Sequence, residues 1–245
     1  MKKIVIILTF IVLSLFLMFL YGKYQMKHKP LVIIMMGPPG AGKGTHATEL
    51  SKDLKLPHIS TGDLFRENIK QNTDLGKKAK SLIDKGVLVP DDIVNQMLFD
   101  YINKHKYFSG YILDGYPRNV DQAIALEKFL PENTKLLVIN LRIDDDLLVE
   151  RITGRLMCRK CGKPFHKTFS PPPNNQNICD DCGGEIYQRS DDTKEVVVKR
   201  LEVYHRETKP VLNYLKNKAK FIEIDASQSK EKVYKDILLE IEKNK

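Results

Sequence analysis

Residues 31–45 read LVIIMMGPPGAGKGT, and this stretch decides how the chain folds. Its first six residues are a continuous apolar run, which is typical of a parallel strand buried on both faces. The glycine-rich residues 37–45 follow, and a helical pattern extends from Lys43 to about Leu54. A strand, a glycine-rich turn with a lysine, and a helix in this order predict a phosphate-binding loop.

Such a loop suits phosphate because successive backbone N–H groups and the helix N-terminus would face the anion. Glycine permits a close backbone approach that a Cβ would block, and Lys43 can reach the β- and γ-phosphates of a nucleotide. Gly44 stands where many such loops place a Ser or Thr that ligates Mg²⁺, and Thr45 comes one residue later. We therefore expect Mg²⁺ to be held mainly through water.

Short apolar runs and helical patterns alternate along the rest of the chain. The apolar runs are residues 111–113, 136–141 and 221–224. The helical patterns are residues 91–104, 121–129, 195–217 with a break at Pro210, and 236–243. This alternation predicts an α/β fold in which helices cover both faces of a parallel sheet.

The N-terminal 30 residues stand outside this pattern. Residues 4–21 are apolar except Thr9 and Ser14, and as a helix they would span about 27 Å, enough for a bilayer core. The run is long for a cleaved signal peptide and lacks an Ala-x-Ala-like site. We favour an uncleaved membrane anchor over a signal peptide, with a polar spacer up to residue 30 and the folded domain at residues 31–245.

The net charge of +9 is unevenly distributed. Residues 1–30 hold five lysines and no acid, which leaves +4 for the remainder. A modest excess suits a protein that binds polyphosphates. A nucleic-acid surface would need a clustered basic stripe, and the sequence has no such run, so we expect no nucleic-acid partner.

Four cysteines stand in two CxxC pairs, Cys158-x₂-Cys161 and Cys179-x₂-Cys182, with 17 residues between the pairs. This spacing predicts a zinc site built from two knuckles. Four thiolates leave no open position, so the zinc would be structural; iron is the alternative ion. A redox role would need a single CxxC at a helix start, and we interpret His166 as a surface histidine.

Three segments in order carry a family resemblance: the loop at residues 37–45, STGDLFR at residues 60–66, and DGYPR at residues 114–118. Together they are similar to adenylate kinases from residue 31 to the C-terminus. The resemblance implies a P-loop sheet, a helical NMP-binding insertion at about residues 60–89, and a zinc-stapled lid at about residues 154–192. It also implies reversible, Mg²⁺-dependent transfer of the terminal phosphate of ATP to AMP, giving ADP.

The resemblance implies an acceptor pocket in which Arg66 and Arg118 supply planar forks that can grip a phosphate. Thr61 favours AMP, because pyrimidine monophosphate relatives tend to carry Ala there, and the Gln122 amide can hydrogen-bond to the adenine edge. The full implied AMP set is Thr61, Arg66, Val87, Leu88, Val89, Gly115, Tyr116, Pro117, Arg118, Gln122, Arg189 and Arg200.

The donor side and the catalytic charges follow from the same resemblance. The implied ATP set is Gly40, Ala41, Gly42, Lys43, Gly44, Thr45, Arg151, Arg155, Pro164, Phe165 and Gln228. The implied catalytic set is Lys43, Asp114, Arg118, Arg155, Arg189 and Arg200. Closure of the lid would bring arginines onto the transferring phosphoryl group and exclude water.

Three acids have two interpretations each. Asp114 either organises water around Mg²⁺ or caps a turn, and Asp191 and Asp192 either lock the lid or are solvated.

Two other functions remain open at this stage. Within the same class, the chain could use GTP as donor or act on UMP or CMP. In a different class, it could be a membrane-tethered zinc-binding module that only senses nucleotide, although such a sensor would not need the arginine set. We expect a monomer that binds ATP, AMP and ADP, with its catalytic domain on the cytoplasmic side, where ATP is available.

Overall fold

The structure is a computed structural model, and it describes residues 14, 16, 29–107, 109–173 and 177–243. The predicted anchor at residues 4–21 lies outside the described residues apart from Ser14 and Phe16. Within the described part, no helix combines the length and the hydropathy that a membrane span needs.

Five parallel strands form the central sheet in the order β2-β3-β1-β4-β8. Leu31, the first residue of β1, is in register with Gly110 on one side and Lys135 on the other. The carboxyl ends of all five strands therefore lie at one edge, where β1 enters the glycine-rich loop. The bounds are β1 Leu31–Met36, β2 His58–Ser60, β3 Gly110–Asp114, β4 Lys135–Arg142 and β8 Lys220–Asp225.

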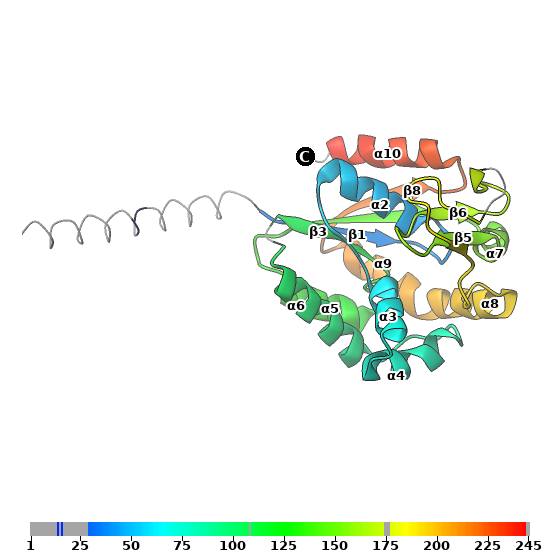
Figure 1. Ribbon diagram of the computed structural model, residues 1–245. Coiled ribbons are helices and arrows are strands. Elements are labelled where there is room, and N and C mark those ends of the chain that lie inside the picture. Colours follow the sequence, from blue (N-terminus) through cyan, green and yellow to red (C-terminus); the bar gives the residue numbers. More distant parts are fainter. Residues whose placement is uncertain (1–13, 15, 17–28, 108, 174–176, 244–245) are drawn as a thin grey trace, which may run out of the picture.

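Helices cover both faces of this sheet (Figure 1), which confirms the predicted fold class. Alternate residues of β1 explain the two layers: Ile33 and Met35 are buried in one apolar cluster, whereas Val32 and Ile34 are buried in the other. The first cluster includes residues of α2 (Lys43–Leu54) and α10 (Lys230–Glu242). The second includes residues of α5 (Asp91–His105), α6 (Val120–Phe129) and α9 (Lys209–Lys216).

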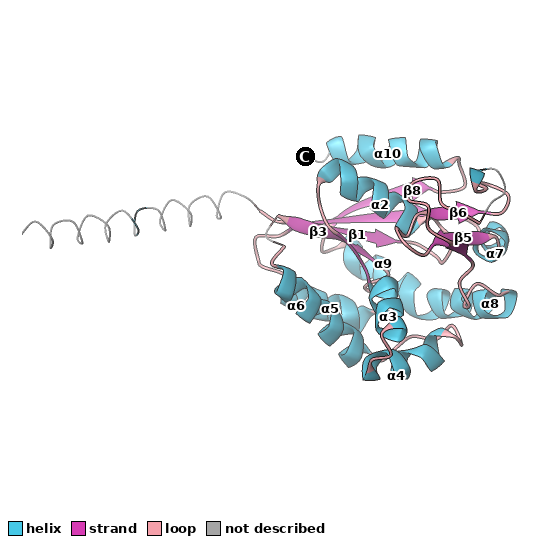
Figure 2. Ribbon diagram, in the orientation of Figure 1, coloured by secondary structure: helices cyan, strands magenta, loops and turns pink. Residues whose placement is uncertain are grey.

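Two smaller units interrupt this core (Figure 2). The helical pair α3 (Thr61–Lys70) and α4 (Asp74–Ile83) follows β2, while η1 (Asp145–Leu147) and α7 (Leu148–Thr153) follow β4. A three-stranded antiparallel sheet then has the order β6-β5-β7, with β5 Arg155–Cys158, β6 Pro164–His166 and β7 Ile186–Tyr187. The chain returns to the core through α8 (Lys194–Val203).

The structure departs from the sequence-based prediction in three elements. The helix predicted at residues 195–217 is α8, a π turn η3 (Tyr204–Thr208) and α9. Pro210 has no N–H to donate, and just before it the Lys209 N–H bonds to the Tyr204 carbonyl. Helix α10 begins at Lys230, six residues before the predicted start, because Ser229 caps a polar first turn. Strand β2 has only three residues and was not predicted.

Candidate functional site

The glycine-rich loop lies at the carboxyl end of β1 and leads directly into α2. A Cβ at Gly37, where φ is +130°, would lie 2.6 Å from the Leu141 carbonyl oxygen, so only glycine fits there. Lys43 Nζ donates hydrogen bonds to the carbonyls of Gly37 and Pro38, at 2.8 Å each. The Lys43 side chain thus folds back over the loop in which it is expected to bind phosphate.

Burial lowers the pKa of Lys43 to about 8, and the nearby Arg118 charge adds to this effect while Asp114 opposes it. A partly buried ammonium group whose positive charge is only weakly compensated favours the binding of an anion. The loop and its lysine therefore form a cationic cradle at the edge of the sheet.

Asp114 ends β3 beside the loop, and its position accounts for the unusual Gly44. A Cβ at Gly44 would lie 3.1 Å from Asp114 Oδ2, a separation that leaves little room for a Ser or Thr side chain. Burial alone would raise the pKa of Asp114, but His58 and Lys43 outweigh it and the pKa lies below its ordinary range. His58 Nε2 is 3.6 Å from Asp114 Oδ2. A charged carboxylate thus faces the place where a hydroxyl would otherwise project.

A cavity opens between the central sheet and the α3–α4 pair. Most of the residues predicted to bind AMP line this cavity. The exceptions are Tyr116, Pro117 and Arg189. Tyr116 instead points into the core, where its hydroxyl donates to Asn95 Oδ1 at 2.6 Å and to the Gln122 carbonyl at 3.0 Å. The lining residues are Thr61, Gly62, Phe65, Arg66, Ile83, Gly86, Val87, Leu88, Val89, Val94, Gly115, Arg118, Gln122, Asp191 and Arg200.

The Gln122 amide is held in one orientation at the wall of this cavity. Its Oε1 accepts from the backbone N–H of Arg118 at 2.7 Å, and its Nε2 donates to Asp91 Oδ1 at 2.7 Å. Asn119 Nδ2 donates to both oxygens of Asp91, at 2.9 and 3.0 Å, and Asn119 Oδ1 accepts from the Gln122 N–H at 2.8 Å. One hydrogen on Nε2 and one lone pair on Oε1 remain for a ligand.

Sequence reasoning missed Asp91 and Asn119 as parts of the site. Asp91 opens α5, where an acid is also expected simply to favour the helix N-terminus, so its position carries no distinct signal. Asn119 is the N-cap of α6, a common role for this residue type.

The predicted arginines surround the same cavity from several elements. Arg118 Nε donates to the Gly115 carbonyl at 2.8 Å, and the Arg118 carbonyl accepts from the Thr208 hydroxyl at 2.7 Å. Arg66 Nε donates to Asp63 Oδ1 at 3.1 Å. Arg189 Nη2 lies 3.6 Å from the same oxygen, so Asp63 links the α3–α4 pair to the end of the small sheet.

Burial, together with the repulsion of the Arg155 charge, lowers the pKa of Arg189 and of Arg200 to about 10. Arg189 Nε is buried and finds no hydrogen-bond partner among the described residues. Mutually repelling, partly unsatisfied guanidinium groups favour a bound anion.

Asp191 and Asp192 are buried, so the interpretation of these two acids as solvated is wrong. Asp192 accepts from Arg155 Nε at 2.8 Å, and Asp191 Oδ2 accepts from Arg200 Nη1 at 3.1 Å. Arg155 begins β5 and Arg200 lies on α8. The two acids therefore tie the small sheet to α8 beside the cavity.

The predicted donor-side residues beyond the loop lie in two places. Arg151 Nη1 donates to the Ala226 carbonyl at 2.9 Å, which brings α7 close to the segment that contains Gln228. Gln228 Nε2 donates to the Asp225 carbonyl at 3.2 Å. The Phe165 side chain is buried in the small sheet with Cys158.

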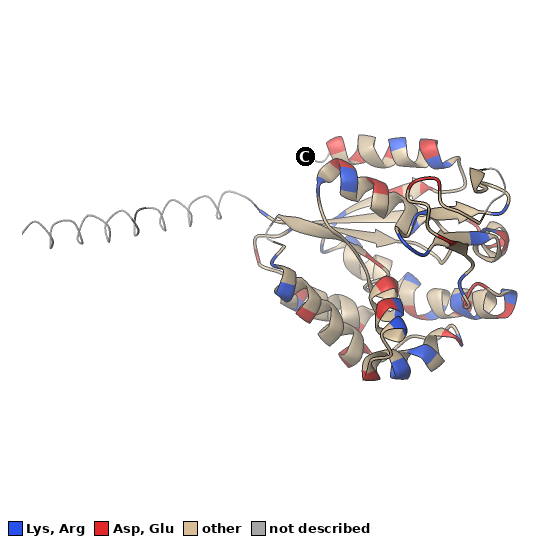
Figure 3. Cartoon of the chain, in the orientation of Figure 1, with Lys and Arg blue, Asp and Glu red and all other residues tan. Residues whose placement is uncertain are grey.

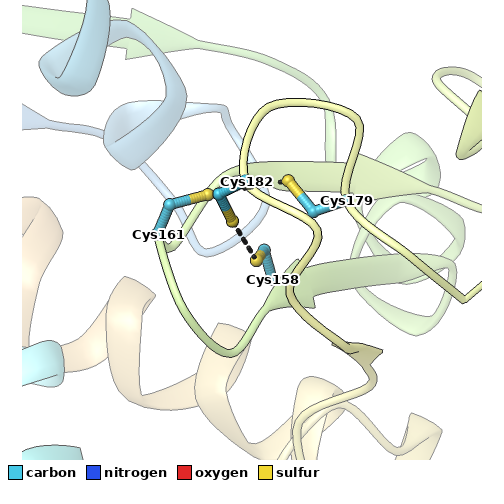
Figure 4. Close-up of side chains that lie close together, drawn as sticks. All are labelled: Cys158, Cys161, Cys179 and Cys182. Atoms are coloured by element: carbon cyan, nitrogen blue, oxygen red, sulfur yellow. Dashed lines mark hydrogen bonds between the residues drawn. The ribbon is translucent and has the colours of Figure 1, made fainter.

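The four cysteines turn their sulfur atoms toward a common centre (Figure 4). All four Sγ atoms lie within 4.8 Å of one another. The Cys158–Cys182 and Cys161–Cys179 sulfur separations are 3.4 and 3.6 Å, close to the roughly 3.8 Å that a tetrahedron of 2.3 Å Zn–S bonds requires. Disulfide bonds would be near 2.0 Å, and the cysteines are free. The donor set therefore fits a tetrahedral metal ion.

His166 is buried, which corrects the interpretation of a surface histidine. Its Nδ1 accepts from the N–H groups of Thr168 and Phe169 at 3.0 Å each, and its Nε2 lies 3.3 Å from the Glu150 carbonyl. A Cβ at Gly154 would lie 2.3 Å from Nε2. The imidazole therefore packs between α7 and the small sheet, apart from the cysteine cluster.

Comparison of the sequence with known proteins finds similar proteins in one family. The family model described as adenylate kinase matches residues 35–220. The adenylate kinase of Caldanaerobacter subterraneus subsp. tengcongensis is 49% identical over 207 residues, which are 84% of this chain and 93% of that protein. Those of Methanosarcina mazei and Methanocella arvoryzae are 48% and 46% identical, over 84% and 86% of this chain and 95% and 98% of their own lengths.

Proposed function

This chain belongs to the adenylate kinase family, and we propose that the loop at residues 37–45 takes ATP while the adjoining cavity takes AMP. The reaction is reversible transfer of the terminal phosphate of ATP to AMP, which gives ADP. The observation that carries the assignment of the two sites is their placement. A cationic phosphate loop and a cavity lined by Arg66, Arg118 and Arg200 meet at the carboxyl edge of one parallel sheet.

Phosphoryl transfer depends on alignment and charge neutralisation more than on covalent chemistry by the protein. We propose that Lys43 leaves the carbonyls of Gly37 and Pro38 and binds the phosphates of ATP. Arg118 and Arg200, which line the cavity, would grip the AMP phosphate and the transferring group. A phosphate acceptor is already nucleophilic, so the site needs no general base.

The proposed adenine contact of AMP is the Gln122 amide. Its free Nε2 hydrogen and Oε1 lone pair form a donor–acceptor pair, which matches the ring nitrogen and exocyclic amine of adenine. Asp91 fixes which end of the amide is the donor. The AMP preference would therefore depend on a residue outside the cavity as well as on Thr61.

Mg²⁺ accompanies ATP in this proposal and would neutralise phosphate charge. The residues fit an ion held through water, because Asp114 is a buried carboxylate beside the loop and Gly44 offers no hydroxyl. The cysteine cluster would hold a structural Zn²⁺, for which its four-sulfur geometry is suited. Zinc would stabilise the small sheet and take no part in the chemistry.

We propose two mobile units around the central sheet: an AMP-binding insertion at about residues 60–89 and a lid at about residues 154–192. The contacts between Arg155 and Asp192 and between Arg189 and Asp63 support a closed arrangement. Closure would place the arginines on the transferring group and exclude water.

The assignment is tested by replacing Lys43 with Ala and measuring ADP formation from ATP and AMP. Loss of turnover is expected, with a cooperative thermal unfolding transition that shows the variant is folded, and Lys52→Ala, on the exposed far end of α2, is the matched control. Normal turnover by Lys43→Ala would refute the role of the loop. A panel of GTP, UMP and CMP tests the nucleotide preference, and rates with UMP equal to those with AMP would overturn the AMP assignment.

The predicted anchor at residues 4–21 stays a prediction, and we propose a catalytic domain on the cytoplasmic side because its substrate ATP is there. Membrane fractionation combined with the ATP and AMP assay tests it. Activity in a soluble fraction from an N-terminally shortened chain would reject the anchor.

A further inference from the structure

Eleven lysines of the folded part of the chain lie at the edge of the sheet opposite the nucleotide sites. All five strands begin at this edge, as the register of Leu31 with Gly110 and Lys135 requires. The helices that precede the strands end there, and so does α10. We call this surface the amino edge; it consists of residues 29–31, 52–57, 104–107, 109–110, 127–135, 216–220 and 240–243.

The amino edge holds eleven lysines and five carboxylates, a net charge of +6 in 33 residues. Residues 1–28 hold four further lysines and no acid, which leaves a net charge of −1 for all the rest of the chain. The positive excess of the folded domain is therefore confined to one edge, although charges of both signs are spread over the elements seen in Figure 3. The sequence hides this, because the segments lie far apart along the chain.

Most of these lysines carry uncompensated charge. Lys218 pairs with Glu127 at 2.8 Å, Lys243 with Glu240 at 2.6 Å, and Lys216 lies 3.8 Å from Glu223. The other eight are exposed and have no ion pair within the described residues: Lys29, Lys52, Lys55, Lys104, Lys106, Lys128, Lys135 and Lys220. The nucleotide cavity, at the carboxyl edge, does not account for them.

We propose that the amino edge docks on the anionic headgroups of a bilayer. The apolar run at residues 4–21 ends ten residues before Leu31, and a chain of ten residues reaches at most about 35 Å. If that run enters a membrane, the amino edge is the surface of the domain held nearest to it. Lysines near an anionic leaflet are attracted within about a Debye length, roughly 10 Å.

Docking in this orientation directs the carboxyl edge away from the membrane. The phosphate loop and the cavity then open toward solution, and the small sheet can move without meeting the bilayer. Nucleotides, which are anionic, also avoid the negative potential of the leaflet. The lysines thus orient the domain, while the apolar run supplies the attachment predicted from the sequence.

The experiment compares two triple variants of the full chain in vesicles. The edge variant changes Lys104, Lys106 and Lys220 to Glu. The control variant changes Lys70, Lys78 and Lys194 to Glu, which are also exposed, have no ion pair within the described residues and lie away from the amino edge. Both variants change the net charge by −6, and circular dichroism with thermal unfolding checks that each is folded.

The full chain is reconstituted into vesicles of phosphatidylcholine alone or with about 30% phosphatidylglycerol, and lysine reactivity is mapped by amine labelling and mass spectrometry. We expect Lys55, Lys128 and Lys135 to be protected about fivefold or more in the anionic vesicles at low salt, since each lysine near such a surface contributes about 1 kcal/mol. Protection should disappear in 0.5 M salt and in the edge variant, and persist in the control variant.

Equal labelling in the two kinds of vesicle would overturn the proposal, and so would equal loss of protection in both variants, which would show that only net charge matters. Protection of the same lysines by single-stranded RNA with none by anionic vesicles would identify a nucleic-acid surface instead. Flotation with phosphatidylcholine vesicles in high salt reports on the apolar run separately, so failure of the anchor and failure of the docking surface give different results.

Discussion

Replacing Asp91 with Ala should weaken the preference for AMP without touching a cavity residue. Asp91 receives three hydrogen bonds, one from Gln122 Nε2 and two from Asn119 Nδ2. An alanine has no acceptor, so all three hydrogen bonds are lost and the Gln122 amide is free to turn over. Asn119 cannot supply a replacement acceptor, because its Oδ1 already caps α6 through the Gln122 N–H.

The size of the effect follows from the bond that is lost. The Gln122–Asp91 contact is 2.7 Å long and its acceptor is a carboxylate oxygen, and hydrogen bonds to charged groups contribute about 1.5–3 kcal/mol. At 1.4 kcal/mol per factor of ten, kcat/KM for AMP should fall roughly 10- to 100-fold. IMP presents the reverse pattern of donor and acceptor, so the ratio of AMP to IMP turnover should narrow by a similar factor.

The assay is steady-state ADP formation with AMP or IMP as acceptor at saturating ATP. The neighbouring Asp92→Ala is the matched control, because Asp92 is exposed. The KM for ATP should change by less than about twofold in both variants, since the network does not reach the phosphate loop. An unchanged AMP to IMP ratio in a stably folded Asp91→Ala protein would refute the proposed locking of the Gln122 amide.

Other predictions concern the loop, the lid and the metal site. Because the pKa of Lys43 is lowered to about 8, the KM for ATP should rise above pH 8, as the unliganded lysine loses its charge; a flat KM profile to pH 9.5 would contradict this. The same depressed pKa means that the charged Lys43 destabilises the folded protein below pH 8. The free energy of unfolding should therefore rise between pH 8 and 10.5, where the folded protein has released this proton and the unfolded chain has not. Denaturant titrations should show this rise in wild type and not in Lys43→Met. Asp192→Ala should cost about 3–5 kcal/mol of unfolding free energy by leaving Arg155 unpaired. The exposed Asp100→Ala is the control and should cost less than about 0.5 kcal/mol, as measured by urea unfolding. Gly44→Ser should lower kcat through its contact with Asp114, and a fully active variant would show that the carboxylate moves freely. Metal analysis should find one zinc per chain, and Cys179→Ser should remove it and lower the unfolding temperature; full zinc occupancy in that variant would rule out the four-sulfur site.

Local residue order was sufficient to predict the central fold. The apolar run of β1, the glycine-rich loop and the start of α2 are contiguous, and each signal arises from neighbours in sequence. The spacing of the four cysteines was equally informative, because a tetrahedral thiolate site needs only two short knuckles. Strand β2 escaped prediction because three residues carry no periodicity, and the start of α10 escaped because its first turn is polar.

Long-range contacts were not predictable in this way. The burial of His166 depends on Gly154 and Glu150, which lie in a different element, and the pairing of Asp192 with Arg155 joins residues 37 positions apart. The Asp91–Gln122 bond spans 31 positions. No local pattern distinguishes these residues from solvated polar side chains, because their environment is supplied by segments that meet only in the folded chain.

The sequence by itself determined that the chain has a phosphate-binding loop, a parallel α/β core, a four-cysteine cluster and an arginine set typical of its family. These features depend on residue types at short, fixed spacings. Only the tertiary structure decided that Asp114 crowds the side-chain position at Gly44, that Asp91 orients Gln122, and that lysines from six separate segments gather at the amino edge. Each of these outcomes depends on distances between remote parts of the chain, which parallel strand order and helix packing set.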